Sequence, residues 1–258
     1  MGQQLTFSKA NAKVRALKHV PALEKYLAER RSVRRSVVTF DLLSGWTCPG
    51  AKDCRARVIL TEGKRSIQET EDTIYRCFSA SQEAAFTTVY DMRQRNFNVL
   101  RRLNSSQMVD ALGAALPRQS GIVRLHVAGD FFNLAYFKAW VEVARLHPDR
   151  LFYAYTKSLP FWIETRAAIP ENFILTASYG GRHDELIRAH RLRFARVIMR
   201  PEQARRLEID HDDSHAADPT RRRMSFALLI HGVQPKGSAA GAAVRALNGE
   251  GSYSRKGH

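Results

Sequence analysis

Short apolar runs rich in β-branched and aromatic residues alternate with longer segments of helical periodicity along most of the chain. Six of these runs have the length and composition of buried strands: 36–43, 122–128, 150–156, 172–178, 195–199 and 225–231. Between them, apolar residues recur at helical spacing, as at Phe137, Trp140, Val141 and Ala144. Strands that alternate with helices form parallel βαβ units. The pattern therefore predicts an α/β fold with six parallel strands.

Six strands are too few for a closed barrel of eight β/α units, which needs about 250 residues for its repeats alone. Residues 1–35 and 44–76 of this 258-residue chain also fall outside the repeat. We therefore expect a partial (β/α)6 barrel of the TIM type over residues 36–232. The alternative is an open, doubly wound sheet, in which the carboxyl ends of the strands are split by a switch point.

Neither a linker nor a low-complexity segment divides the chain, so we expect residues 1–258 to form a single domain. In this scheme residues 1–35 are a basic helical extension, and residues 233–258 are a Gly/Ala/Ser-rich C-terminal tail whose last ten residues are mobile. The stretch after the first strand alternates in polarity around Glu62 and Gly63. This predicts a β-hairpin inserted in that loop.

The charge of the chain is strongly basic. It carries 41 Lys and Arg against 25 Asp and Glu, a formal net charge of +16. Such a balance favours a polyanionic partner, most often nucleic acid. The densest basic cluster reads RRSVRRS, and we expect its arginines to contact phosphates, although a solvated helix face is the alternative. These arginines are Arg30, Arg31, Arg34 and Arg35.

The apolar content gives no sign of a membrane segment. No run approaches eighteen apolar residues, and the N-terminal sequence lacks the unbroken apolar region of a secretory signal. We therefore expect a cytoplasmic protein without a membrane partner. A reducing compartment disfavours disulfides, so metal ligation or plain burial are the interpretations that remain for the three cysteines.

The cysteines lie in one predicted loop and at the start of the helix that follows it. Cys48 and Cys54 belong to SGWTCPGAKDC, directly after the first strand, and Cys77 leads into the next helix. Three thiolates leave one iron of a 4Fe-4S cluster open to a substrate or cofactor, whereas a structural zinc site takes four protein ligands. We expect a 4Fe-4S cluster here. Zinc with a histidine as fourth ligand, or thiols without a metal, are the alternatives.

Polar residues follow several of the predicted strands at their carboxyl ends, which in parallel α/β folds carry the functional groups. We expect Asp130, Lys157, Tyr179 and His231 to converge there as catalytic or substrate-binding residues, in one pocket facing the cysteines. The lysine and histidine could hold a phosphate or carboxylate, the aspartate could accept a hydrogen bond, and the tyrosine could stack on a base or donate a proton. His126, inside a strand, is expected to be an ordinary core histidine.

A second group of polar residues occurs in EIDHDDSHA. His211 and His215 are four positions apart among Asp210, Asp212 and Asp213. Mixed carboxylate and imidazole ligands suit a divalent metal for phosphodiester hydrolysis. The alternative is an ordinary loop in which the aspartates cap turns or pair with the arginines at 221–223.

Several motifs carry a resemblance to a known family. SGWTCPGAKDC, RCFSASQEA, VRLHVAGDFFNLAYFKAWVEVA, FYAYTKSLPFW, LTASYGG, IDHDDSHA and SFALLIHG resemble the uncharacterised bacteriophage gene product 88 family over nearly the whole chain. More distantly, VRLHVAGDF, WVEVARLHP and FYAYTKSLP are similar in layout to radical S-adenosylmethionine-like proteins. That class carries a three-cysteine cluster on a partial barrel. Here, however, five residues separate Cys48 from Cys54 and twenty-two separate Cys54 from Cys77, unlike the short motif of the usual radical enzyme.

Two classes of function are therefore compatible with the sequence. The first is an iron-sulfur protein that acts on or binds nucleic acid or nucleotides, with S-adenosylmethionine as a ligand that the distant resemblance implies. If the chain is phage-encoded, it would work in the host cytoplasm. The second is a metal-dependent nuclease, or a non-catalytic DNA-binding protein whose cysteines hold structural zinc.

Overall fold

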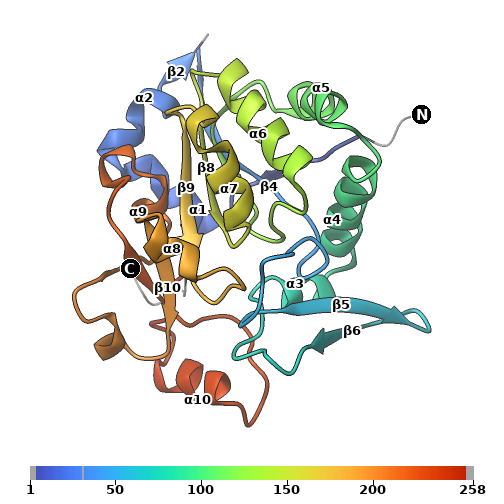
Figure 1. Cartoon of the computed structure of the whole chain (residues 1–258), viewed down its shortest axis with the longest axis vertical. Helices are drawn as coiled ribbons and strands as arrows, with labels where there is room; N and C mark the ends of the chain where they lie inside the picture. The colour runs from blue at the N-terminus through green and yellow to red at the C-terminus, as the bar shows by residue number, and fades with distance from the viewer. Residues whose placement is uncertain (1–3, 31, 254–258) are drawn as a thin grey trace.

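The structure, a computed structural model, describes residues 4–30 and 32–253 (Figure 1). Its centre is an eight-stranded sheet in the order β1, β4, β7, β8, β9, β10, β12 and β11. The strands are β1 Ser8–Lys9, β4 Ser36–Phe40, β7 Ser120–Leu125, β8 Leu151–Thr156, β9 Phe173–Ser178, β10 Phe194–Ile198, β11 Glu208–Ile209 and β12 Phe226–Leu229. The six strands predicted from the sequence are present. The two-residue edge strands β1 and β11 were not predicted, nor was a separate antiparallel pair formed by β2 Glu29–Arg30 and β3 Val33–Arg34.

The six central strands are parallel and follow one another in chain order. β1 is antiparallel to β4, and β11 is parallel to β12. A doubly wound sheet is defined by a reversal of its strand order, and the six central strands show no such reversal. The short edge strand β11 lies out of chain order, beyond β12. The carboxyl ends of all six strands therefore lie along one edge of the sheet. β1 and β11 each have a single neighbour among the described residues, so the sheet is open.

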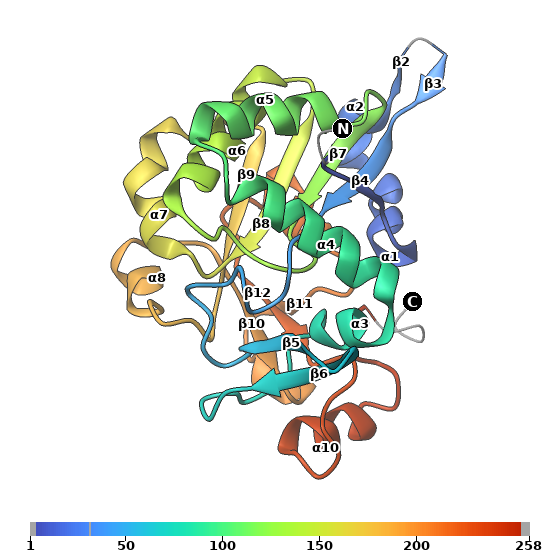
Figure 2. The same cartoon turned by 90° about the vertical axis from the view of Figure 1, so that its right-hand side faces the viewer.

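Helices cover the sheet on both faces. They are α1 Ala12–Arg15, α2 Glu24–Leu27, α3 Ala80–Ala85, α4 Thr87–Leu100, α5 Ser105–Ala115, α6 Leu134–Leu146, α7 Leu159–Thr165, α8 Glu185–Ala189, α9 Ser214–Ala217 and α10 Ala239–Ala246. In Figure 2, α5, α6 and α7 lie on one side of the strands, and α1 and α2 lie on the other. Within the described residues, no helix is long and apolar enough to cross a membrane.

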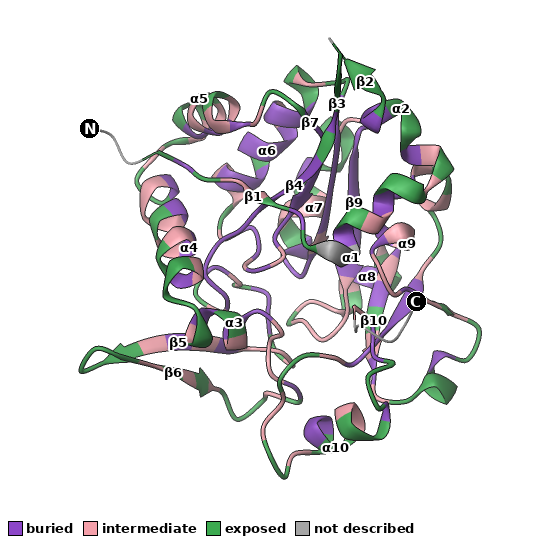
Figure 3. Ribbon diagram, turned by 180° about the vertical axis from the view of Figure 1, so that it is seen from behind, coloured by how far each residue is buried: buried purple, intermediate pink, exposed green. Residues whose placement is uncertain are grey.

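The larger core lies between the sheet and α4, α5 and α6. Helix α6 begins after Asn133, whose side chain accepts the N–H of Tyr136 at 2.8 Å as an N-cap. The helix buries Phe137 and Trp140, as its periodicity predicts, and Trp140 packs on Phe40 of β4 with ring centroids 5.4 Å apart. Figure 3 shows this buried layer along the strands.

The N-terminal segment covers the other face of the sheet. Val14, Leu17 and Leu23 are fully buried and pack with Ile122 of β7 and Tyr153 of β8. The expected basic extension thus also forms the second layer of the core, through the buried apolar residues of its described part. The reason is their apolar spacing, since Val14 and Leu17 lie one helical turn apart and share a face.

The predicted hairpin in the cysteine loop is present. β5 Ala56–Thr61 pairs antiparallel with β6 Lys64–Glu69, and Glu62 and Gly63 turn the chain with φ of 49° and 75°. Positive φ at both turn residues is typical of a tight hairpin turn. Val58 and Ile67 pack on Leu43 and Tyr90, which attaches the hairpin to the body.

The C-terminal segment contacts the body of the protein through Ser252 and Tyr253. Ser252 is fully buried, its hydroxyl accepts the N–H of Leu229 at 2.8 Å, and it donates to the backbone oxygen of Asp210 at 2.5 Å. Of the last ten residues, which we expect to be mobile, Gly251 and Ser252 are buried, Gly249 and Glu250 are exposed, and residues 254–258 lie outside the described part of the chain. Backbone groups of Leu229, at the end of β12, and of Asp210 make these contacts.

Candidate metal centre

The cysteine loop lies directly against the carboxyl ends of β8 and β9. A Cβ on Gly50 would lie 2.2 Å from the backbone oxygen of Lys157, so only glycine permits this approach. The backbone N–H groups of Lys52 and Asp53 both donate to the carbonyl of Gly180, at 3.3 and 3.0 Å, and Arg182 donates to that of Gly50 at 2.9 Å. These bonds hold the segment between Cys48 and Cys54 at the edge of the sheet.

The three cysteines come together at this edge, and none forms a disulfide. Burial raises the pKa of the Cys48 thiol well above its usual range, and Asp130, Cys77 and Cys54 raise it further. Burial likewise raises the pKa of Cys54 to about 11, with Lys157 opposing and Cys77 adding to the shift. Each pair of thiols is thus close enough to interact electrostatically. Their side chains remain partly accessible to solvent.

Cys77 has polar neighbours that stabilise a thiolate. Burial raises its pKa, while hydrogen bonds from the backbone of Ser79 and the side chain of Ser44 lower it. The backbone N–H of Ser44 donates to one carboxylate oxygen of Glu83 at 2.9 Å. The Ser44 hydroxyl lies 2.9 Å from the same oxygen, and its single proton serves either Glu83 or the Cys77 thiol. Glu83 is fully buried and pairs with Arg93 at 3.0 Å. The Ser44–Glu83 contact joins the helix that follows Cys77 to the segment that precedes Cys48, and the pair with Arg93 joins that helix to α4.

Asp130 connects the ends of two strands beside the cysteines. One carboxylate oxygen accepts the N–H of Phe131 and the hydroxyl of Thr156, both at 2.7 Å. The other accepts the N–H of Lys157 at 2.8 Å. Burial raises the pKa of Asp130, and these hydrogen bonds oppose the shift. Since three donors hold the carboxylate, its principal role in this conformation is to join β7 to β8.

Lys157 lies on the same edge but points toward β9. Its ammonium donates to the hydroxyl of Ser178 at 2.7 Å, to the carbonyl of Ser178 at 3.0 Å and to that of Tyr179 at 2.5 Å. Three acceptors use all three donors of the ammonium group. The lysine therefore joins β8 to β9, and its charge also lowers the pKa of Cys54.

The side chains of the other two predicted residues, Tyr179 and His231, pack on aromatic rings. Tyr179 packs on the outer side of the sheet, edge-on to Phe194, and the guanidinium of Arg196 lies 4.2 Å from its ring centroid. His231 packs on Phe78, the residue after Cys77, with centroids 3.6 Å apart. Burial lowers the pKa of His231 to about 3, so the imidazole is neutral at physiological pH. Of the four residues, only Asp130 and Lys157 have charges that act directly on the thiols.

Sequence reasoning missed several neighbours of the cysteines. Tyr75 is buried, and its pKa is raised by burial and then by the charges of Cys54, Asp53 and Cys77. Ser44 and Glu83 were also missed. The only signal for them is proximity in sequence to Cys48 and Cys77, which is too weak to distinguish them from other loop residues.

The donor set differs from that of a single-ion site. Within residues 4–30 and 32–253, no three His, Cys, Asp or Glu side chains are gathered around the position of one metal ion. Thiolates that share one zinc ion lie only about 4 Å apart, because each Zn–S bond is about 2.3 Å long. In a cubane each thiolate binds a different iron, so the sulfurs stand farther apart. A 4Fe-4S cluster held by the three cysteines therefore stays a prediction.

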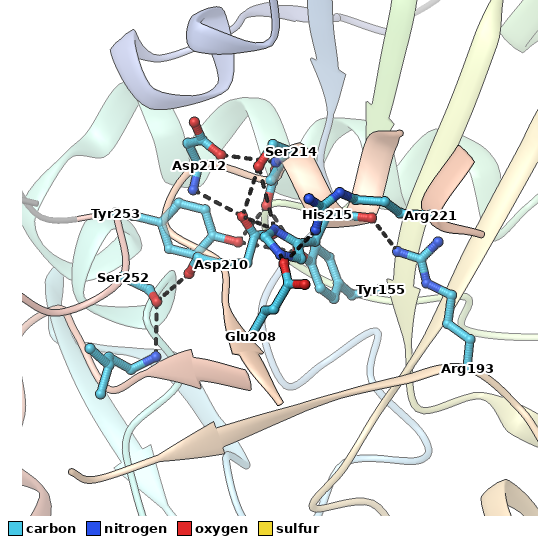
Figure 4. A network of polar contacts seen from close by, with 12 residues as sticks. Tyr155, Arg193, Glu208, Asp210, Asp212, Ser214, His215, Arg221, Ser252 and Tyr253 are labelled. Atoms are coloured by element: carbon cyan, nitrogen blue, oxygen red, sulfur yellow. Dashed lines mark hydrogen bonds and ion pairs between the residues drawn. The ribbon is translucent and has the colours of Figure 1, made fainter. Parts of the chain in front are cut away.

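The second predicted metal site is a network of internal contacts (Figure 4). His215 lies between Glu208, at 2.8 Å, and the fully buried Asp210, at 3.3 Å. Arg221 also pairs with Glu208, at 2.6 Å. His215 is thus used as a cation between two carboxylates, and its pKa is raised because Asp210 and Glu208 outweigh the effect of burial. The ordinary-loop alternative describes this segment, and the metal-site interpretation is not supported.

The same segment also packs on the face of the sheet that the N-terminal segment covers. Asp213 is fully buried and pairs with Arg124 of β7 at 2.5 Å. It accepts the hydroxyls of Tyr153 at 2.9 Å, Tyr155 at 3.1 Å, and Tyr253. His126 is a core histidine, as expected, since it is buried and its Nε2 lies 3.1 Å from the hydroxyl of Tyr136.

The arginines predicted to contact phosphates are largely engaged within the protein. Arg30 pairs with Asp149 at 2.5 Å, and Arg34 pairs with Glu24 at 3.1 Å. Arg35 is buried and donates to the backbone oxygens of Asp149 and Ser120. The assignment of Arg35 to a phosphate-binding surface is corrected, because its guanidinium is enclosed. Arg31 lies outside the described residues.

Comparison with known proteins gives one family and no closer relative. The family model described as Gene product 88 matches residues 5–248. Neither a curated protein nor a solved structure matches the chain significantly, and nothing in the comparison supports a relation to the radical S-adenosylmethionine class. Since the match includes the sheet, the cysteine loop and the segment around Asp213, the chain belongs to the gene product 88 family.

Proposed function

We propose that Cys48, Cys54 and Cys77 hold a 4Fe-4S cluster and that the protein acts on or binds nucleic acid or nucleotides. One observation carries the proposal: thiols from three points of one long insertion meet at the carboxyl ends of parallel strands and raise one another's pKa. In parallel α/β folds this edge is the usual place for a functional site.

The immediate surroundings favour a cluster over isolated thiols. The pKa of Cys77 is lowered by hydrogen bonds from Ser44 and from the backbone of Ser79, and that of Cys48 by one from the backbone of Gly45. Hydrogen bonds to ligand sulfurs are one of the features by which proteins tune such clusters. Lys157 adds a positive charge that stabilises the Cys54 thiolate.

A cluster with three cysteine ligands supplies electron transfer and one iron that can bind a small molecule. The chain's own residues would then keep the site rigid, because Asp130 joins β7 to β8 and Lys157 joins β8 to β9. A partial (β/α)6 barrel also has its parallel strands in chain order. We therefore infer that the open sheet curves as part of such a barrel. The nucleic-acid part of the proposal rests on the net charge of +16.

Anaerobic purification followed by iron and sulfide analysis tests the cluster. We expect a brown protein that absorbs at about 400 nm and loses both iron and sulfide in the Cys48→Ala, Cys54→Ala, Cys77→Ala variant. Undiminished iron in that variant, or a colourless wild type that holds zinc, would overturn the proposal. Adding S-adenosylmethionine to the reduced wild type and recording its electron paramagnetic resonance spectrum tests whether that molecule reaches the open iron.

The competing function, a nuclease with a metal at His211 and His215, has no comparable support. Its carboxylates serve other partners, since Asp210 pairs with His215 and Asp213 pairs with Arg124.

A further inference from the structure

Arginines are concentrated in one segment that the sequence reasoning did not single out. Residues 179–206 contain eight arginines and three carboxylates, a net charge of +5 within 28 residues of a chain whose total is +16. The carboxylates are Asp184, Glu185 and Glu202. The segment runs from the end of β9 through α8 and β10 to the 3-10 turn Pro201–Ala204 and its exit. Nearly a third of the net charge therefore lies on β10 and on the segments directly before and after it.

Seven of these arginines are exposed. They are Arg182, Arg188, Arg191, Arg196, Arg200, Arg205 and Arg206. In the described part of the chain, none of the seven forms an ion pair. Arg30, Arg34 and Arg35, by contrast, all have carboxylate partners. The charge of the 179–206 segment is therefore available to an external anion.

The architecture explains why this surface is open. Helix α8 has only five residues, and it leaves Arg196 of β10 exposed on the outer side of the sheet, over the ring of Tyr179. Beside it lies a cavity of about 630 Å³ lined by Tyr179, Asp184, Glu185, Arg188 and Ala189. Asp184 accepts the N–H groups of Gly180 and Gly181, both at 2.9 Å, so its charge is partly neutralised by the turn.

This surface adjoins the cysteine loop. Gly180 and Gly181, which follow Tyr179, bind the backbone of the loop between Cys48 and Cys54 through Lys52, Asp53 and Ala51. Figure 1 shows α8 and β10 next to each other at the lower left of the sheet. A chain of phosphates along β10 would therefore pass the edge that carries the candidate metal centre.

We propose that the arginine face, defined as the exposed surface of residues 179–206, binds the phosphate backbone of nucleic acid. The inference rests on the nucleic-acid part of the proposed function and gives it a location. A polyanion is the occupant that the charge favours, because unpaired guanidinium groups form bidentate contacts with phosphates. Contacts of this kind give affinity and register without base specificity.

Fluorescence anisotropy with oligonucleotides of about 20 nucleotides tests the proposal, with single-stranded DNA, duplex DNA and single-stranded RNA as separate arms. The test variant is Arg188→Ala, Arg196→Ala, Arg200→Ala. The matched control is Arg15→Ala, Lys18→Ala, Lys25→Ala, which removes the same charge from three exposed residues of the N-terminal segment that form no ion pair with the described residues. Circular dichroism and a melting curve establish that both variants are folded.

We expect the test variant to bind at least about tenfold more weakly than the wild type at 0.1 M salt. On duplex DNA, the log-log salt slope should become shallower by about 3, since each lost phosphate contact contributes about 0.9. The control should change the affinity by less than about threefold. Equal losses in the two variants would overturn the proposal, because they would reflect net charge alone. No binding by the wild type, or binding only to anionic vesicles, would also overturn it.

The same assay separates this inference from the cluster proposal. The triple cysteine variant, which cannot hold a cluster, should retain nucleic-acid binding because the arginine face contains none of the three cysteines. If it binds while the wild type proves free of iron, the cluster proposal fails and the arginine face stands. If the wild type holds iron but the arginine variant binds nucleic acid as tightly as the wild type, the arginine-face proposal fails and the cluster proposal stands.

Discussion

The carboxylate of Asp130 accepts the backbone N–H of Lys157 at 2.8 Å, although the two residues are 27 positions apart. This bond joins the carboxyl ends of β7 and β8 beside Cys48, whose pKa Asp130 also raises. The edge of the sheet is thus held by side chains of the strands themselves. The cysteine loop therefore contacts an edge whose strands are joined by hydrogen bonds of Asp130 and Lys157.

Asp130→Asn should lower stability by about 1–3 kcal/mol, because the amide would place a donor against at least one of three donors that now face a carboxylate. Urea unfolding measures the effect. Asp110→Asn, at an exposed aspartate without an ion pair among the described residues, is the control and should change the free energy of unfolding by less than about 0.5 kcal/mol. Equal effects of the two substitutions would contradict this role for Asp130.

Glu83 and Arg93 form a buried pair whose removal from one side should be costly. Glu83→Gln should destabilise the protein by about 3 kcal/mol, since Arg93 would keep a buried charge without its partner. The Glu83→Gln, Arg93→Met double variant should lose less than the sum of the two single substitutions. A double-mutant cycle from denaturant titrations checks this, and additive losses would count against a coupled pair.

The thiol of Cys54 should react slowly with alkylating agents. Burial raises its pKa to about 11, so only a small fraction is thiolate at neutral pH. In a Cys48→Ser, Cys77→Ser background of the metal-free protein, we expect iodoacetamide at pH 8 to react about a hundredfold more slowly than with glutathione. The rate should rise with pH up to about 11. A rate that levels off near pH 8.5 would refute the raised pKa.

The His215 contacts should make stability depend on pH. The pKa of His215 is raised by Asp210 and Glu208, so its contribution is fully present below about pH 6.5 and is lost as pH rises through the folded-state pKa. Asp210 has a lowered pKa, so its contribution is lost when pH falls below about 3.8. Melting temperatures of the wild type and His215→Ala should therefore differ most at about pH 5 to 6. A difference that is constant from pH 5 to pH 9 would exclude this mechanism.

The C-terminal segment should stabilise the fold through Tyr253. Its hydroxyl donates to Asp213, which is fully buried, and lies 3.2 Å from the hydroxyl of Tyr155. We expect Tyr253→Phe to cost about 1–2 kcal/mol in thermal or urea unfolding. Combining it with Tyr155→Phe should give a non-additive loss, since both hydroxyls serve one carboxylate. A neutral Tyr253→Phe variant would mean that this contact is unimportant in solution.

The sequence predicted the strands, the hairpin and the main buried helix well because each depends on local periodicity. Six apolar runs became six central strands, and Phe137 and Trp140 became core residues of α6. The positions of Cys48, Cys54 and Cys77 after the first strand likewise placed them at the carboxyl edge. Local pattern is sufficient here, because the direction of a parallel strand decides which edge its loop occupies.

The pairing of charges and the burial of the N-terminal segment depend on contacts between distant segments. Such contacts cannot be predicted from local sequence patterns. The first 35 residues looked like a basic extension, yet their apolar side chains cover the sheet and Arg35 is enclosed. Lys157 and Tyr179 share a strand edge, but one side chain points to the backbone of β9 and the other to the outer face. The seven exposed arginines form a candidate binding surface because α8 is short and because none of them has a carboxylate partner among the described residues. The sequence by itself determined which residues form strands and where the cysteines stand, through periodicity and direction. Tertiary packing decided which charges are paired and which are free, since that depends on partners far away in the chain.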